Sequence, residues 1–279
     1  MIPELAHELA PLLRQFVHGE YGIALGGAHA KGVEDAESDL DLYIFARDIL
    51  PNAERTRLCR QLIGNEPQVV SWGHDAVFTQ AGTDFYYQGQ KVECWLRHAD
   101  LISTSVAECR RGIVKREFVT WTTTGFYNHC VLSDLSHMVP LEDPAGMLAR
   151  WQREVAVYPP ELRQAIMEQH LSAAHFWPDN FHYLSAIERC DLIYVTGIVQ
   201  QAAHNLIQVL FALNRVYFPG DKKLDVAIRL LPLKPERVEE RLQRLIFPGA
   251  QPTKELLSEQ GEELRRLVRE VDVLAHTTT

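Results

Sequence analysis

Three acidic side chains stand where their type and spacing could hold a metal ion. Asp39 and Asp41 are separated by one residue in the run 38–42, which reads Ser-Asp-Leu-Asp-Leu. On a β-strand, side chains two residues apart project from the same face, so both carboxylates would point one way while the leucines anchor the strand. Two carboxylates about 6–7 Å apart along a strand can converge on Mg²⁺, which prefers oxygen ligands. The spacing therefore predicts a cation site suited to phosphoryl chemistry.

A third carboxylate is predicted on a neighbouring strand. In the run 91–96, Val92, Cys94 and Leu96 alternate on one face and Glu93 lies on the other. A single glutamate in a strand is usually a solvated edge residue. Glu93 is the only acid in an otherwise apolar strand, however, and we predict it to be the third ligand.

Glycines next to the first two acids suit the other reactant. The apolar run 21–25 ends at Gly26 and Gly27, where a backbone without Cβ atoms can approach a polyphosphate and offer its amide groups. Ser38 could add a hydroxyl, and Lys31 could reach a phosphate as a point charge. Nucleotidyl transfer depends mainly on such positioning and charge neutralisation.

Periodicity predicts the elements that position these residues. Apolar spacing predicts helices over 4–17, 53–63 and 101–110, strands over 21–25, 39–45, 68–72, 84–87 and 91–96, and a loop over 28–38. Beyond about residue 140 helical patterns dominate, over 192–213, 222–230, 235–245 and 253–274. We therefore predict an α+β fold: a mixed β-sheet flanked by helices over 1–140, followed by an all-helical bundle over 141–279.

Composition narrows the partners. The chain has 28 basic and 37 acidic residues. Its net charge of −9 disfavours binding to nucleic acid and favours binding of cationic small molecules or peptides. Five cysteines at wide spacings form neither a disulfide framework nor a zinc cluster. The N-terminus lacks a signal-peptide pattern, and polar residues interrupt the most apolar stretch, 192–213. We expect a cytoplasmic chain without a membrane partner, as a monomer or homodimer.

The glycines and acids together resemble the nucleotidyltransferase superfamily that includes DNA polymerase beta, and most of all its bacterial aminoglycoside and lincosamide nucleotidyltransferases. That pattern is an apolar residue, Gly, Gly or Ser, a loop of about ten residues, and Asp-apolar-Asp. The matching residues are Leu25, Gly26, Gly27, Asp39, Leu40 and Asp41. Two departures are the second glycine in place of the commoner serine, and Lys31 where an arginine is frequent.

The helical half resembles the helical domain of bacterial relatives in 188–191, 210–215, Tyr217 and 219–223. This resemblance implies that Lys222 or Lys223 contacts the triphosphate; the alternative is that both begin the next helix in solvent. It also implies that Glu188 or Asp191 binds a cationic acceptor or acts as a base. A surface ion pair with Arg189 is the alternative.

The resemblance implies an adenylyltransferase that moves AMP from ATP to a hydroxyl of a small acceptor and releases pyrophosphate. Asp39 and Asp41 would hold two Mg²⁺ ions, and Glu93 would hold the second ion or act as general base. Two alternatives remain: transfer to a protein side chain, as in antitoxins of this superfamily, and a non-catalytic nucleotide-binding module.

Overall fold

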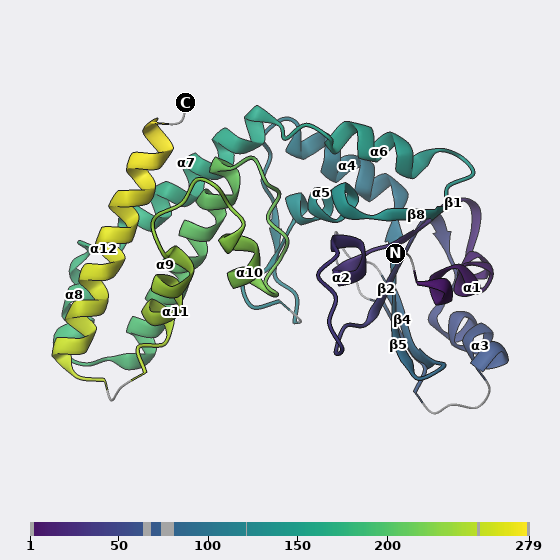
Figure 1. The fold of residues 1–279 in the computed structure, drawn as a ribbon, viewed down its shortest axis with the longest axis horizontal. Coiled ribbons are helices and arrows are strands. Elements are labelled where there is room, and N and C mark those ends of the chain that lie inside the picture. The colour runs from purple at the N-terminus through teal and green to yellow at the C-terminus, as the bar shows by residue number, and fades with distance from the viewer. Residues whose placement is uncertain (1–2, 64–67, 74–80, 121, 250–251, 278–279) are drawn as a thin grey trace. The chain divides into compact units, whose positions relative to one another are not determined.

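The computed structural model describes residues 3–63, 68–73, 81–120, 122–249 and 252–277. The chain divides into two compact units, one of residues 1–109 and 115–157 and one of residues 110–114 and 158–279. We predicted a boundary at residue 140, whereas residues 141–157 lie in the first unit. The fold is α+β, with a mixed sheet in the first unit and helices in the second (Figure 1).

The first unit contains helices α1 (Glu4–Leu13), α2 (Gly27–Lys31), α3 (Asn52–Ile63), α4 (Ala99–Cys109), α5 (Asn128–His137) and α6 (Met147–Val155), with a short 3₁₀ helix at Arg14–Phe16. Its strands are β1 (Val17–Leu25), β2 (Leu40–Ile49), β3 (Val70–Gly73), β4 (Ala81–Tyr87), β5 (Gln90–His98), β6 (Arg116–Glu117), β7 (Phe126–Tyr127) and β8 (Val139–Glu142). The predicted strands and the helices over 4–17, 53–63 and 101–110 all have counterparts here.

The main sheet has the strand order β3-β4-β5-β2-β1-β8. Strands β2 and β5 pair in parallel, and the other neighbouring strands pair antiparallel. The start of β2, the start of β5 and the end of β1 therefore meet at one edge of the sheet. This edge carries the predicted glycines and acids.

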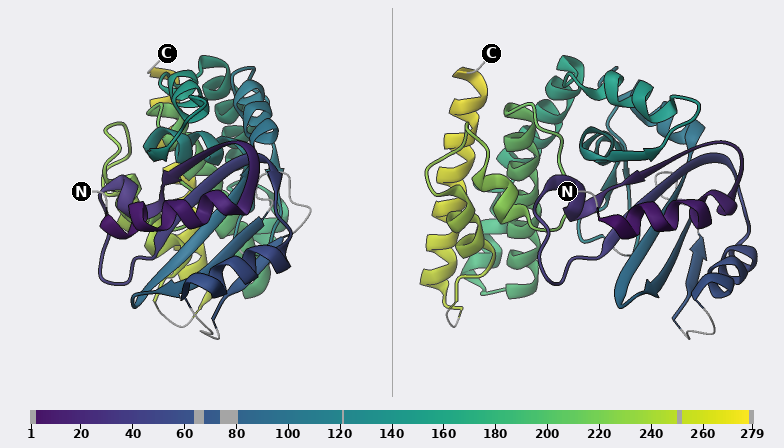
Figure 2. Two further views of the ribbon diagram at one scale, coloured as in Figure 1. Left: turned by 90° about the vertical axis from the view of Figure 1, so that its right-hand side faces the viewer. Right: turned by 45° about the vertical axis from the view of Figure 1, so that its right-hand side comes forward.

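The two faces of the sheet differ in character. On one face, the leucines and cysteine of β2 and β5 are fully buried in a core shared with α1 and Cys59 of α3. Helices α4 and α6 pack on the other face (Figure 2), where Trp151 of α6 contacts the ring of Phe45 at a centroid distance of 5.4 Å. The alternation of the strands therefore leaves Asp41 and Glu93 on this second face, toward the edge where β2 and β5 begin.

One predicted element is wrong. We predicted a loop over 28–38, but a short helix, α2, begins directly at Gly27. Its last residue is Lys31. The next residue, Gly32, has a left-handed φ of 65°, the conformation that favours glycine directly after a helix. The two alanines at 28 and 30 support the helical turn, and the loop is confined to the residues after Gly32.

The second unit is made of α7 (Pro160–Phe176), α8 (Phe181–Glu188), α9 (Leu192–Leu213), α10 (Leu224–Arg229), α11 (Val238–Ile246) and α12 (Lys254–Thr277). Helix α9 is its core, because α7, α8, α10, α11 and α12 all pack against it and most of its C-terminal half is buried. This confirms the helix predicted over 192–213. Three of its interrupting polar residues, His204, Asn205 and Gln208, are buried in the bundle, whereas Gln200 and Gln201 are exposed.

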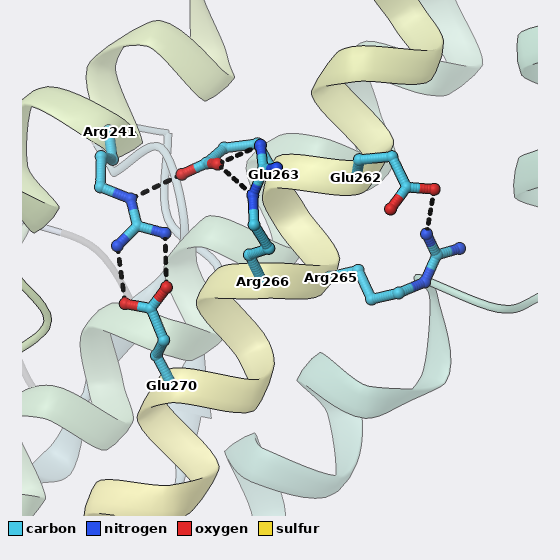
Figure 3. A network of polar contacts seen from close by, with 6 residues as sticks. All are labelled: Arg241, Glu262, Glu263, Arg265, Arg266 and Glu270. Atoms are coloured by element: carbon cyan, nitrogen blue, oxygen red, sulfur yellow. Dashed lines mark hydrogen bonds and ion pairs between the residues drawn. The ribbon is translucent and has the colours of Figure 1, made fainter.

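An ion-pair network joins two helices of this bundle (Figure 3). Arg241 of α11 donates to Glu263 at 2.6 Å and makes two bonds to Glu270, at 2.7 and 2.9 Å. Both acids lie on α12. A forked guanidinium bond of this kind fixes the position of one helix relative to another more firmly than a single contact does.

In the described part of the chain, no helix combines the length and the apolar character that crossing a membrane requires.

Candidate active site

The acids predicted from the sequence meet at the edge where β2 and β5 begin. Asp41 is the register partner of Glu93 across the parallel pair β2–β5, so the two side chains leave neighbouring strands on the same face. Asp39 immediately precedes β2. Its carboxylate and that of Glu93 each lie 2.7 Å from Nζ of Lys91, which places the two acids beside each other.

Lys91 is a site residue that sequence reasoning missed. Its ammonium group lies between Asp39 and Glu93, and these hydrogen bonds, to Asp39 first and then to Glu93, raise the pKa of Lys91. Among the described residues, no group of three or more His, Cys, Asp or Glu side chains is arranged as a ready set of metal ligands. The structure thus has a lysine cation between two of the three predicted acids.

The two glycines fit tightly against the acids. The amide of Gly26 donates to the carbonyl of Asp41 at 2.9 Å, which joins the end of β1 to the start of β2. Gly27 has a φ of +58°, and a Cβ on it would lie 1.7 Å from Oδ2 of Asp41. A Cβ on Gly26 would lie 2.3 Å from the ring of Tyr43. Gly27 therefore gives the Asp41 carboxylate room beside the backbone of the turn, and Gly26 gives room to the ring of Tyr43.

A fourth carboxyl group, on Asp84 of β4, belongs to the same row. Asp84 is the register partner of Glu93 across the antiparallel pair β4–β5, and it accepts a hydrogen bond from Nε1 of Trp72 at 2.9 Å. Burial raises the pKa of Asp84 to about 6; the Trp72 bond opposes this rise, and the nearby Glu93 carboxylate adds to it. Asp84, Glu93 and Asp41 thus form a row across three adjacent strands.

This row gives a stability prediction. Because the pKa of Asp84 is raised in the folded chain from the ordinary 3.8 to about 6, its proton stabilises the fold at low pH, and that contribution is lost as the pH rises through about 6. Without divalent metal, Asp84→Asn should gain melting temperature over wild type by roughly 2–4 °C between pH 4 and 7. Thermal unfolding measures the gain, with Asp48→Asn, an exposed acid of β2, as control. A difference in melting temperature between Asp84→Asn and wild type that stays constant with pH would contradict the prediction.

The predicted phosphate contacts lie at different places. Lys31 ends α2 and is partly exposed. The hydroxyl of Ser38 donates to Asp35 at 2.9 Å and accepts from the amide of the same residue, so it closes a turn of the loop. Lys222 and Lys223 are exposed residues of the second unit, and Lys223 is the N-cap of α10. That position corresponds to the alternative considered for the two lysines.

The two acids suggested for the acceptor have different surroundings in the second unit. Glu188, at the end of α8, pairs with Lys254 at 2.5 Å, and Arg189 donates to Ser185 instead. Asp191 precedes α9 but does not cap it with its side chain. Its carboxylate makes no hydrogen bond or ion pair with the described residues, and Asp191 is one of the residues that line an open hollow of about 510 Å³.

This hollow combines an acid with aromatic rings. Trp177 and Tyr194 line it with Asp191, and their rings stand perpendicular at a centroid distance of 6.3 Å. Nε1 of Trp177 donates to Gln201 at 3.2 Å, which holds the indole in place. Two rings and a carboxylate around an open space are the groups that bind organic cations.

Comparisons with known proteins give few matches. Residues 130–224 match the model of a domain of unknown function (DUF4037), a segment that begins in α5 and does not include the acids of β2 and β5. No curated protein matches the sequence. Among solved structures, the chain is similar to a nucleotidyltransferase-like protein from Exiguobacterium sibiricum, with 11% sequence identity and a TM-score of 0.47 over 98% of this chain and 78% of that one.

Proposed function

We propose that this chain is a magnesium-dependent nucleotidyltransferase that moves AMP from ATP to a hydroxyl of a small cationic acceptor. One observation carries the proposal: Asp39, Asp41 and Glu93 leave the starts of two parallel strands on the same face, beside a double-glycine turn. The aminoglycoside and lincosamide antibiotics are the first acceptors to test.

The three predicted ligands supply carboxylate oxygens, the type of donor atom that a hard divalent cation prefers. The carboxylates of Asp39 and Glu93 already accommodate a positive charge, since each lies 2.7 Å from the Lys91 ammonium, and Asp41 is adjacent in register. Oxygen ligands of this kind suit Mg²⁺. When bound, Mg²⁺ would neutralise phosphate charge and orient the α-phosphate for attack.

The residues of the chain then have distinct tasks. The acceptor oxygen attacks the α-phosphorus, a new P–O bond forms, the bond to the β-phosphate oxygen breaks, and pyrophosphate leaves. The proton of the acceptor hydroxyl passes to Glu93 or to solvent. The Gly26–Gly27 turn brings the backbone close to the nucleotide, while Lys31, at the end of α2, is the lysine we assign to its phosphates.

The hollow in the second unit supports a cationic acceptor. Of the two acids, Glu188 forms an ion pair with Lys254, whereas Asp191 is exposed and lines the hollow together with Trp177 and Tyr194. We therefore assign the ammonium group of the acceptor to Asp191. The net charge of −9 favours the approach of such a molecule.

This assignment predicts a specific kinetic change. Asp191→Asn should raise KM for a polycationic acceptor about tenfold, the effect of losing one charged contact of roughly 1.4 kcal/mol, and leave kcat within about twofold. Steady-state pyrophosphate release measures both. Glu259→Gln, an exposed acid of α12, should behave as wild type. An unchanged KM in Asp191→Asn would show that the acceptor does not bind in this hollow.

The activity itself is tested by incubating the chain with Mg-ATP and a panel of aminoglycosides and lincosamides. We expect pyrophosphate release together with an acceptor whose mass has increased by one adenylyl group. If a co-purified protein is modified instead, the acceptor is a protein side chain and not a small molecule. Absence of both products with every nucleoside triphosphate would reject the enzyme.

A second candidate, a non-catalytic nucleotide-binding module, is favoured by one observation. Lys91 neutralises part of the charge of Asp39 and Glu93 without any metal. Such a module would bind ATP with the same affinity whether or not Mg²⁺ is present. Calorimetry with and without Mg²⁺ separates the two, because the enzyme requires Mg²⁺ for tight ATP binding.

A further inference from the structure

Lys91 occupies the position that a metal ion would take between two of the acids. Its Nζ lies 2.7 Å from Oδ2 of Asp39 and 2.7 Å from Oε1 of Glu93. The three side chains are 38, 30 and 19% exposed, respectively, so the cluster is partly withdrawn from water. An ammonium group held by two partly buried carboxylates is a stronger contact than an ordinary surface ion pair.

The strand geometry makes this arrangement specific. Lys91 and Glu93 are two residues apart on β5 and therefore share a face. The parallel register pairs Leu40 with Val92 and Asp41 with Glu93, and the residues just before this pairing, Asp39 and Lys91, meet in a 2.7 Å ion pair. Lys91 thus offsets part of the repulsion between acids that the sheet forces together, with Asp84 as a fourth acid across the hairpin.

We infer that Lys91 is a resident counter-ion that a divalent metal displaces when it binds to Asp39 and Glu93. The inference rests on the proposed function, since it takes these acids as the metal ligands. A metal ion that binds Oδ2 of Asp39 and Oε1 of Glu93, the two oxygens that now accept from Lys91, takes the space of the ammonium group and releases the lysine. The flexible four-carbon stem of Lys91 lets the charge move without a change of the strand. Once released, the ammonium group is available to the triphosphate.

Metal binding tests this directly. Mn²⁺ is titrated by calorimetry into the full chain, without nucleotide or acceptor. Lys91→Met should bind Mn²⁺ about tenfold more tightly than wild type, because no cation has to be displaced. Lys91→Arg keeps the competing charge and should stay within about threefold of wild type. Arg60→Met removes one charge from an exposed position of α3, and the Mn²⁺ affinity of this variant should equal that of wild type.

A second readout does not depend on a variant. Labelling of the Lys91 amine in wild type by an amine-reactive ester, followed by mass spectrometry, should increase severalfold when Mn²⁺ is added, because the amine leaves its two carboxylates. Mn²⁺ should also raise the melting temperature of Lys91→Met more than that of wild type, since tighter binding to the folded state stabilises it more.

The outcomes separate this inference from the proposed function. A Mn²⁺ affinity of Lys91→Met equal to or weaker than that of wild type, no binding to either chain, or labelling that Mn²⁺ leaves unchanged would overturn the role of Lys91. Pyrophosphate release is measured independently. If the Mn²⁺ predictions hold but no nucleotide is transferred, the role of Lys91 is supported and the proposed activity is rejected.

Discussion

Replacing Asp39 and Asp41 together by asparagine is expected to reduce kcat for nucleotidyl transfer by at least about 10³-fold, because the change removes the charge that holds the cation at the site of phosphoryl chemistry. Asparagine keeps the size of each side chain, and the backbone bond from Gly26 to the carbonyl of Asp41 is unaffected. The fold should therefore remain, and Mn²⁺ binding should be lost along with activity.

The matched control for this variant is Asp48→Asn. Asp48 lies on β2 and is exposed; its replacement makes the same Asp-to-Asn change, with the loss of one charge instead of two, at a distance from the site. Its pyrophosphate release should equal that of wild type. Wild-type turnover by the Asp39→Asn/Asp41→Asn chain would end the proposed mechanism.

The second large effect is expected at Gly27. A Cβ at this position would lie 1.7 Å from Oδ2 of Asp41, and the residue has a φ of +58°, so Gly27→Ala must both strain the backbone and displace the carboxylate. Left-handed backbone costs an alanine about 1 kcal/mol, and a displacement near 1 Å at a reacting centre can cost about 10²-fold in rate. We expect kcat/KM for ATP to fall by about 10²-fold or more.

Gly32 separates these two causes. It is also left-handed, with a φ of +65°, but a Cβ there would meet no atom within 4 Å. Gly32→Ala should lose a few degrees of melting temperature, as Gly27→Ala does, and keep its transfer activity. An equal loss of activity in both variants would attribute the effect to backbone strain and not to the Asp41 carboxylate.

Alternating apolar residues predicted the strands of the site well. The leucines of β2 and the apolar side chains Val92, Cys94 and Leu96 of β5 are buried on one face, which left Asp41 and Glu93 on the other as the sequence indicated. That the strands β2 and β5 are neighbours was predicted, because a third ligand was expected beside the first two, whereas their parallel direction and register were not. This pairing joins strands that are separated by 40 residues, which include α3, β3 and β4, and no local pattern encodes its register.

The two missed residues had signals in the sequence. Lys91 lies two residues before Glu93, and the period of a strand puts both on one face. Asp84 follows from the hairpin: Gln88 and Gly89 both have positive φ, a two-residue turn that pairs Tyr87 with Gln90 and therefore Asp84 with Glu93. The short helix α2 was missed because five residues give too little periodicity to be distinguished from a loop.

In the helical half, the elements and candidate acceptor residues were predicted, but the hollow that Asp191 helps line was not. The pattern over 192–213 predicted α9 because its apolar residues repeat over the length of the helix. The hollow that includes Asp191 depends instead on Trp177, which follows a different helix and contacts the ring of Tyr194 at 6.3 Å. Contacts between residues of separate helices are set by packing, and the sequence names the residues without their neighbours.

A crystal structure of the chain grown with Mn²⁺ and a non-hydrolysable ATP analogue tests the central claim most directly. Anomalous scattering should place Mn²⁺ about 2.2 Å from carboxylate oxygens of Asp39, Asp41 and Glu93, with the α-phosphate bound to the same ion and the ammonium of Lys91 moved away from its present partners. Nucleotide bound elsewhere, or no anomalous peak among these three side chains, would contradict the account.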